Sequence, residues 1–333
     1  MSGSAGKPKR ILYLSDLLGG CAWYRCHAPG MALQRLGHEV RLQDTLEFED
    51  IDWCDVLIVQ RIGETKLARA FEYARSRDKL TVYDLDDDLW SLASTNQVKE
   101  YWSQERLGGL ATVLRAADRV TTSTQPLALL LGAYCSDVRV IPNMLPQEDW
   151  PSVGKDFDHA APIVVGWAGG VSHYQDLKEV ADVLGQLLDR HPGIEVHLAG
   201  AEEEWVAPHE RLKYLESVRL EEYAGLLSGF DIAIAPLCDN RFNASKSDLK
   251  VLEYSMIGLP AVASKVPAYS ASVRHGETGF LARNAKDWLK HLSALVEDAE
   301  LRARMGSAAR AWAQTRTVEG NISLWERAYD ISE

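Results

Sequence analysis

Two lysines and a glutamate, Lys246, Lys250 and Glu253, are spaced four and three residues apart in the segment SKSDLKVLEYSMIGLP. On an α-helix this spacing places all three side chains on one face. Ser245 is a favourable N-cap residue, so we expect the helix to begin there. Because cations oppose the dipole at a helix N-terminus, the two lysines point to a bound anion such as a diphosphate. Glu253 could accept hydrogen bonds from a ribose diol. An ordinary exposed Lys–Glu pair is the alternative.

A glycine pair follows the predicted strand that opens the second half of the chain, in the stretch GWAGGVSHYQD. Glycines let backbone N–H groups approach a ligand closely. A helix beginning by Asp176, capped by Ser172 or a neighbour, would direct its positive end toward that ligand. The alternative is a plain strand-to-helix turn with His173 as a surface histidine. We expect phosphate binding, with these donor-side residues: Trp167, Gly169, Gly170 and His173.

Aspartates crowd the end of another predicted strand, in the stretch VYDLDDDLW. At the carboxyl end of a parallel strand they would face a cleft. Adjacent carboxylates could bind Mg²⁺ or Mn²⁺. Alternatively, the run resembles the nucleophile motif of haloacid-dehalogenase phosphatases, with Asp84 and Asp86 as nucleophile and acid. Asp84 or Asp86 could also simply cap the turn into LWSLAS. The candidate catalytic residues are Asp86, Asp87 and Asp88.

The N-terminal stretch GGCAWYRCHAPG reads as a glycine-containing loop after the first strand. It lacks the G-x-G-x-x-G fingerprint, which argues against a dinucleotide oxidoreductase. Gly20 is expected on the donor side of a cleft. Aromatic rings commonly stack on sugar faces. The guanidinium group of Arg25 could hold an acidic or phosphorylated acceptor, and Arg61 is a second cationic candidate. The alternative for Trp23 and Tyr24 is packing beneath the loop. The candidate acceptor residues are Trp23, Tyr24, Arg25, His27 and Arg61.

The overall composition is that of a globular protein of 333 residues, with 46% hydrophobic and 25% charged residues. A net charge of −12 argues against a broad nucleic-acid surface, so no nucleic-acid partner is expected. The five cysteines form no CxxC pair and are expected to be reduced thiols in a cytosolic protein. The polar opening MSGSAGKPKR precedes no apolar segment of signal-peptide type, and no run is long enough to span a bilayer.

Short apolar runs alternate with helical patterns in both halves of the chain, which predicts two tandem α/β domains with parallel, doubly wound sheets. A proline-rich acidic stretch separates them. In the second half, residues 175–191 read as one long helix. Ligands of such folds bind beyond the carboxyl ends of the strands, so two facing domains would form a cleft. We divide the chain into an N-terminal domain 1–148, a linker 149–161, a nucleotide-binding domain 162–312 and a C-terminal segment 313–333.

These motifs together resemble GT-B glycosyltransferases, and most closely the retaining family-four enzymes, also called glycosyl transferases group 1. The resemblance rests on RVIPN, GWAGGVSHYQD, DIAIAPL, RFNASKSDLKVLEYSMIGLPAVAS, VRHGETGFLA and SLWERAY. It covers nearly the whole chain and is strongest from Ile163 to Asn284. It implies two Rossmann-like domains facing a cleft, with the last helix crossing back to the first domain.

The resemblance also implies transfer of a sugar, with retention and without a metal or other cofactor, from a nucleotide-sugar donor to a carbohydrate or lipid-linked acceptor. Glu253 corresponds to the second glutamate of the family's E-x7-E motif, which contacts the ribose. The first glutamate is replaced by Ser245, so this is a divergent branch. The aspartates occupy the place of the family's cleft histidine. A degenerate protein that binds a sugar nucleotide without turnover is the alternative. We expect a cytoplasmic location and leave open peripheral contact with the inner membrane face.

Overall fold

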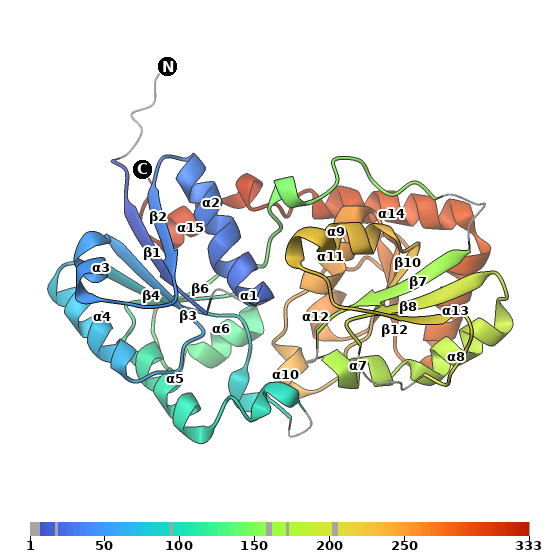
Figure 1. Ribbon diagram of the computed structural model, residues 1–333, viewed down its shortest axis with the longest axis horizontal. Coiled ribbons are helices and arrows are strands. Elements are labelled where there is room, and N and C mark those ends of the chain that lie inside the picture. Colours follow the sequence, from blue (N-terminus) through green and yellow to red (C-terminus); the bar gives the residue numbers. More distant parts are fainter. Residues whose placement is uncertain are drawn as a thin grey trace, which may run out of the picture.

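The computed structural model describes residues 7–16, 19–93, 96–157, 162–170, 173–201 and 206–332. The chain forms two α/β halves that lie side by side, each with a central sheet between layers of helices (Figure 1). None of the helices among the described residues has the length and apolar character that crossing a bilayer requires.

The first half is built on a six-stranded parallel sheet in the order β2-β1-β3-β4-β5-β6. The central strands carry branched apolar residues and are buried on both faces, as expected for a parallel sheet covered by helices. The strands are β1 (Arg10–Leu14), β2 (Glu39–Gln43), β3 (Val56–Gln60), β4 (Leu80–Leu85), β5 (Arg119–Thr122) and β6 (Val138–Val140). The main helices are α1 (Gly20–Ala22), a π-helical turn (Trp23–His27), α2 (Ala28–Arg35), α3 (Phe48–Trp53), α4 (Lys66–Ser76), α5 (Gln104–Ala116) and α6 (Gln125–Leu131).

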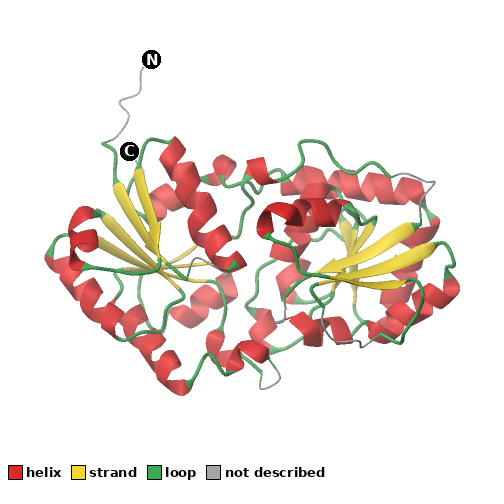
Figure 2. Cartoon of the chain, viewed as in Figure 1, coloured by secondary structure: helices red, strands yellow, loops and turns green. Residues whose placement is uncertain are grey.

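The second half repeats this plan, with a sheet covered by helices (Figure 2). Its strand order is β12-β11-β10-β7-β8-β9, again all parallel. Its strands are β7 (Ile163–Ala168), β8 (Ile194–Ala199), β9 (Leu212–Leu215), β10 (Ile232–Ala235), β11 (Ala261–Ser264) and β12 (Gly279–Ala282). Its helices are α7 (Tyr174–Lys178), α8 (Ala181–Arg190), α9 (Leu220–Ser228), α10 (Arg241–Ala244), α11 (Leu249–Ile257), α12 (Pro267–Ser270), α13 (Ala285–Glu297) and α14 (Ala299–Ala313).

The two strand orders fix where a ligand can bind. In the first sheet the direction of winding reverses between β1 and β3, and in the second it reverses between β7 and β10. Open α/β sheets bind ligands at this switch point, beyond the carboxyl ends of the strands. The predicted fold class, two doubly wound Rossmann-like domains, is therefore confirmed.

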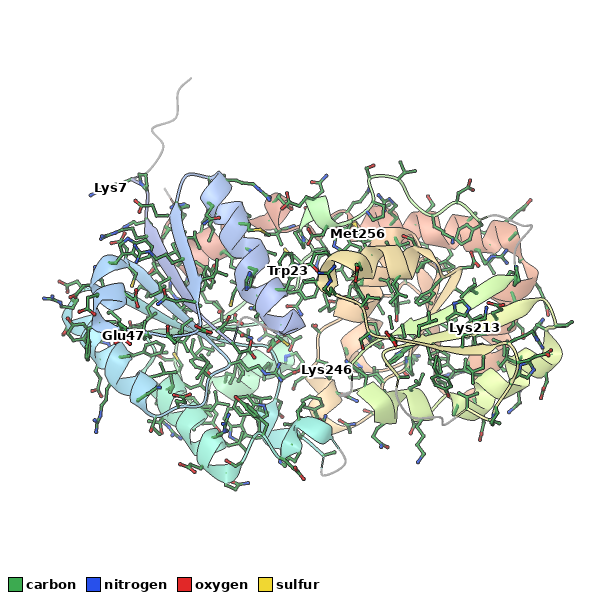
Figure 3. The ribbon with its side chains drawn as sticks, viewed as in Figure 1. Lys7, Trp23, Glu47, Lys213, Lys246 and Met256 are labelled. Atoms are coloured by element: carbon green, nitrogen blue, oxygen red, sulfur yellow. The ribbon has the colours of Figure 1, made fainter. Side chains whose placement is uncertain are left out.

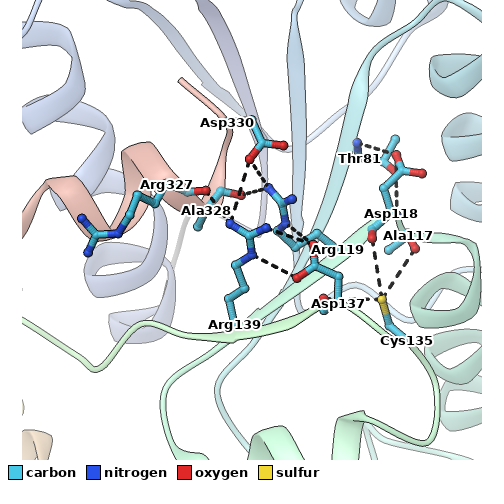
Figure 4. A network of polar contacts seen from close by, with 10 residues as sticks. All are labelled: Thr81, Ala117, Asp118, Arg119, Cys135, Asp137, Arg139, Arg327, Ala328 and Asp330. Atoms are coloured by element: carbon cyan, nitrogen blue, oxygen red, sulfur yellow. Dashed lines mark hydrogen bonds and ion pairs between the residues drawn. The ribbon is translucent and has the colours of Figure 1, made fainter. Parts of the chain in front are cut away.

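The end of the chain returns to the first half, where α15 (Ser323–Ala328) packs against the β1 side of the sheet. Arg119 Nη1 on β5 donates to the Ala328 carbonyl at 2.6 Å and pairs with Asp330 at 3.0 Å (Figure 4). Arg139 on β6 donates to the Arg327 carbonyl at 2.6 Å. These bonds satisfy carbonyls that the end of α15 would otherwise leave unpaired.

Two expectations about local structure are wrong. The stretch read as a loop is helical from Gly20 through Arg35, since neither Gly20 nor Pro29 interrupts it: Pro29 lies in the first turn of α2, where its missing N–H costs no hydrogen bond. The single helix expected over 175–191 is broken between α7 and α8. The first error matters for function because it moves Trp23 and its neighbours from a loop onto a helix.

Candidate active site

A cavity of about 630 Å³ lies between the two halves, at the carboxyl ends of both sheets. Both switch points open onto it, since Gly20 follows β1, Arg61 follows β3, and Gly169 follows β7. The structure brings these predicted residues to its lining: Gly20, Tyr24, Arg61, Asp86, Asp87, Gly169, Gly170, His173, Lys246, Lys250 and Glu253. We call His173, Lys246, Lys250 and Glu253 the C-terminal wall, and Cys21, Arg61, Asp86 and Asp87 the N-terminal wall.

Lys250 is held in the first turn of α11 and reaches the end of β7. Its ammonium group donates to the Ala168 carbonyl and lies 5.3 Å from the centre of the Trp167 ring. A side chain at position 169 could not fit, since a Cβ there would approach Cζ2 of Trp167 to 2.5 Å. Burial lowers the pKa of Lys250 below its ordinary value. The glycine therefore leaves the backbone and the ammonium group open to the same space.

Lys246 lines the cavity from a turn and not from the helix on which it was predicted. The helix begins at Leu249 with Asp248 as its N-cap residue, while Ser245 ends the preceding helix α10. The Ser245 carbonyl accepts from Thr124 Oγ1 at 2.8 Å, which ties this turn to the first half. The prediction of Ser245 as N-cap is therefore wrong, and Lys246 lies in the turn between the helices. Figure 3 shows Lys246 where the two halves meet.

His173 is fixed beside these lysines, with Nδ1 2.9 Å from Oδ2 of Asp176. A carboxylate only accepts, so Nδ1 carries the proton and Nε2 remains an acceptor. Burial, followed by the positive charge of Lys246, lowers the pKa of His173 to about 4. The ring is therefore neutral near pH 7 and offers an acceptor for a hydroxyl. Ser172, predicted as a cap for the following helix, lies outside the described residues.

Glu253 lies on α11 one turn after Lys250 and receives two phenolic hydrogen bonds. Tyr24 donates from the first half at 2.8 Å, and Tyr223 donates from α9 at 3.1 Å. Burial raises the pKa of Glu253. Each carboxylate oxygen retains a further acceptor position, so the side chain can accept additional hydroxyls. Tyr24 therefore contacts the C-terminal wall directly across the domain boundary.

The N-terminal wall is a compact cluster around the Arg61 guanidinium. Nη1 of Arg61 lies 3.5 Å from Oδ1 of Asp86 and 3.4 Å from Oδ2 of Asp87. It also donates to Cys21 Sγ at 2.9 Å. Lys246 crosses the cavity to Asp87 Oδ1 at 3.4 Å. Asp87 is thus contacted by a cation from each half.

The pKa values of the two adjacent aspartates are shifted in opposite directions. Burial raises the pKa of Asp86 and outweighs the attraction of Arg61. Burial also acts on Asp87, but Lys246 and Arg61 outweigh it and lower the pKa of that group. Asp87 is therefore the carboxylate that stays ionised at neutral pH. It can accept a hydrogen bond or a proton from a hydroxyl group.

Cys21, Asp86 and Asp87 also offer ligand atoms within 4.8 Å of one another, the spacing of a metal site. Arg61 already contacts all three of these groups. A divalent ion would have to lie beside this guanidinium charge, which disfavours it. The cation that balances these acids in the structure is therefore arginine.

Arg25 does not reach the cavity, and its predicted role in acceptor binding is corrected. Its side chain is 1% exposed and pairs with Asp84 at 2.7 Å. It also donates to the Ile141 carbonyl at 2.6 Å and to Asn143 at 3.1 Å. This buried pair also excludes Asp84 as a phosphatase nucleophile or as a cap, because its oxygens accept from Arg25 and from Thr121 at 2.7 Å.

Four further predicted residues do not line the cavity. Trp23 and His27 stack on each other at 5.7 Å on the helical stretch, and burial lowers the pKa of His27. Trp167 is fully buried beneath Lys250. Asp88 is also fully buried, and its backbone carbonyl, rather than its carboxylate, begins the turn into LWSLAS. Their predicted contacts with a substrate in this cavity are therefore not supported by the structure.

The sequence interpretation missed several lining residues. Cys21 was read only as a buried thiol, and Asn143 and Ser247, which bond to each other at 2.9 Å, were not singled out. The end of the cavity near β8 and β9 was also missed, because β9 carries too short an apolar pattern to predict. That end is lined by Gly200, Ser217, Val218, Leu220, Tyr223 and Leu226.

Residues 162–298 match the family model of glycosyl transferases group 1. Curated relatives include D-inositol 3-phosphate glycosyltransferases. That of Pseudarthrobacter chlorophenolicus is 31% identical over 122 residues, 35% of this chain and 28% of the relative. That of Corynebacterium jeikeium is 24% identical over 185 residues, 50% of this chain and 43% of the relative. The chain thus aligns with less than half the length of these relatives.

Solved structures share the fold over almost the whole chain. Sucrose-phosphate synthase from Thermosynechococcus elongatus has a TM-score of 0.65 and 15% identity, covering 97% of this chain and 98% of that one. Anabaena Alr3699/HepE, in complex with UDP and glucose, has a TM-score of 0.69 and 19% identity, covering 96% of this chain and 99% of that one. The predicted resemblance is therefore confirmed: residues 162–298 match the group 1 glycosyltransferase family, and almost the whole chain shares the fold of these solved structures.

Proposed function

From its similarity to the group 1 glycosyltransferases, we propose that this protein transfers a hexose from a nucleotide-sugar donor to a hydroxyl acceptor. The proposal includes retention of anomeric configuration and no requirement for a metal. The observation that carries it is the cavity between the halves, with two ammonium groups on the C-terminal wall and an ionised aspartate on the N-terminal wall. Anabaena Alr3699/HepE binds UDP-glucose, which supports a UDP-sugar as the donor class.

The two lysines bind the diphosphate in this mechanism. Negative charge grows on the leaving nucleoside diphosphate as the glycosidic bond breaks, and fixed cations stabilise that charge in the transition state. Lys246 and Lys250 lie on one side of the cavity, and Gly169 leaves space for the phosphates to approach the end of β7. Binding of the diphosphate separates Lys246 from Asp87, because both anions compete for one ammonium group.

Glu253 accepts the ribose hydroxyls, and the two tyrosines orient its carboxylate. Nε2 of His173 accepts from a hydroxyl of the donor sugar. Asp87, once Lys246 turns to the diphosphate, orients the acceptor hydroxyl, and Arg61 keeps it ionised. Ser245 takes no part, since it is buried outside the lining of the cavity. Closure of the halves around both substrates excludes water and limits hydrolysis.

A thermal-shift screen of UDP-, GDP- and dTDP-sugars identifies the donor, because a ligand that binds the folded state raises the melting temperature. Nucleotide release is then measured with a panel of hydroxyl acceptors, with and without EDTA. The proposal predicts stabilisation by one nucleotide class and acceptor-dependent release that EDTA leaves unchanged. Stabilisation without release by any acceptor would favour the alternative, a sugar-nucleotide-binding protein without turnover.

A further inference from the structure

A second cavity, of about 280 Å³, lies on the outer edge of the C-terminal half. It is formed where the end of β11, the segment around β12 and the start of α13 meet. It shares no lining residue with the cavity between the halves. Its polar lining residues are Lys265, His275, Arg283, Asp287, Lys290 and His291.

The charge of this lining is strongly positive. Lys265, Arg283 and Lys290 contribute three cations against the single carboxylate of Asp287, so two positive charges remain. Arg283 pairs with Asp287 at 2.9 Å, whereas Lys265 and Lys290 form no ion pair within the described part of the chain. Repulsion between the two ammonium groups opposes their clustering. This positive cluster lies in a chain whose net charge is −12. A bound anion would remove this cost.

Two imidazole rings add hydrogen-bonding capacity. Nδ1 of His275 accepts from the Leu281 backbone N–H at 2.9 Å, so Nε2 carries the proton of the neutral ring and is a donor. His291 is only 8% exposed, stacks on Phe280 at 4.4 Å, and has no hydrogen-bond partner among the described residues. Its ring nitrogens are therefore available to hydrogen-bond a ligand in this cavity.

We propose that this cavity binds a phosphoryl group, separately from the nucleotide-sugar cleft. A phosphate or phosphate monoester carries close to two negative charges at pH 7, which matches the two excess positive charges of the residues that line the cavity. Its oxygens can accept from both lysines, from Nε2 of His275 and from a protonated His291. Burial lowers the pKa of His291, followed by the effect of His275, and a bound anion opposes both effects. A bound anion therefore raises the pKa of His291 and favours the protonated ring.

The test is a titration of the full chain with inorganic phosphate, and separately with glycerol phosphate, at constant ionic strength. The imidazole signals of His275 and His291 are followed by NMR and assigned with H275Q and H291Q. We expect saturable shifts and a higher pKa for His291 in the bound state. Removing both lysines, in K265A/K290A, should weaken binding at least about tenfold, whereas K286A is the matched control because exposed Lys286 lies on α13 outside the lining.

The same titration in K246A/K250A separates this site from the cleft, since phosphate bound there would be lost while the histidine shifts persist. Tighter binding of glycerol phosphate would identify a phosphate monoester as the ligand, and equal or tighter binding of inorganic phosphate would identify the free ion. Histidine signals that follow only ionic strength, or that respond equally in K265A/K290A, would overturn the proposal.

Discussion

The two walls of the cleft differ in whether their charged groups have ion-pair partners within the same domain. On the N-terminal wall, Arg61 contacts both Asp86 and Asp87, so each charge has a partner within the same domain. On the C-terminal wall, Lys246 has a partner only across the cleft, and Lys250 is neutralised by no carboxylate contact among the described residues. The acids of one wall are therefore paired within their own domain, while the other wall has an excess of positive charge. This difference supports the proposal that the diphosphate binds at the C-terminal wall and the acceptor hydroxyl at the other.

The largest expected effect concerns the support behind the N-terminal wall. Arg25→Leu would leave Asp84 as an unpaired buried carboxylate, and breaking a buried ion pair costs about 3–5 kcal/mol of unfolding free energy. Denaturant unfolding measures this loss. The control is the double variant R25L/D84L, which removes both charges and should recover most of the stability. A stability loss in the double variant as large as in the single one would show that packing, and not the charge, is responsible.

The next effect tests the excess charge of the C-terminal wall. Lys250→Ala and Lys246→Ala each remove a charge-assisted hydrogen bond to the diphosphate, which corresponds to about 1.5–3 kcal/mol, or roughly a tenfold to hundredfold loss of UDP affinity. Calorimetric titration with UDP measures it. Lys213→Ala is the control, because Lys213 is an exposed residue of β9 outside the cavity. This variant should bind UDP with the same affinity as the unchanged protein. Unaltered affinity in both cleft variants would contradict the assignment.

Asp87→Asn tests the opposite wall. The amide keeps the shape but cannot take a proton, so turnover should fall by about 10²–10⁴. UDP affinity should be retained or improved, because Lys246 loses its competing partner. Initial rates and calorimetry on the same preparation separate the two effects. Equal losses of binding and turnover would place Asp87 on the donor side.

The smallest effect is in the pH dependence of donor binding. The pKa of Lys250 is lowered from its ordinary value of 10.5, so the free site loses this charge at a lower pH than an exposed lysine would. UDP affinity should therefore fall as the pH rises through that lowered pKa, below 10.5. Lys250→Arg keeps its charge over this range, so its affinity should fall less. Parallel curves for the two proteins would refute a titrating role for Lys250.

Much of the fold and of the candidate site could be predicted from the sequence, because the strands are apolar runs and the polar residues of the site follow directly after several of them. The spacing of Lys250 and Glu253 correctly placed both on one helix that faces the cleft. Lys246 also lines the cleft as predicted, although it lies in the turn before that helix. Local spacing could not show that Arg25 pairs with Asp84, a residue 59 positions away. Nor could it distinguish Asp88, which is buried 3.9 Å from Arg241, from Asp87, which lines the cavity, since only tertiary packing separates adjacent side chains.

The central claim, that a pyrophosphate binds between Lys246 and Lys250, is tested most directly by a structure of the full chain with UDP. The account predicts both ammonium groups within hydrogen-bond distance of the phosphate oxygens, Glu253 on the ribose, and the contact between Lys246 and Asp87 broken. A UDP molecule whose phosphates lie away from both lysines, with that contact intact, would contradict it.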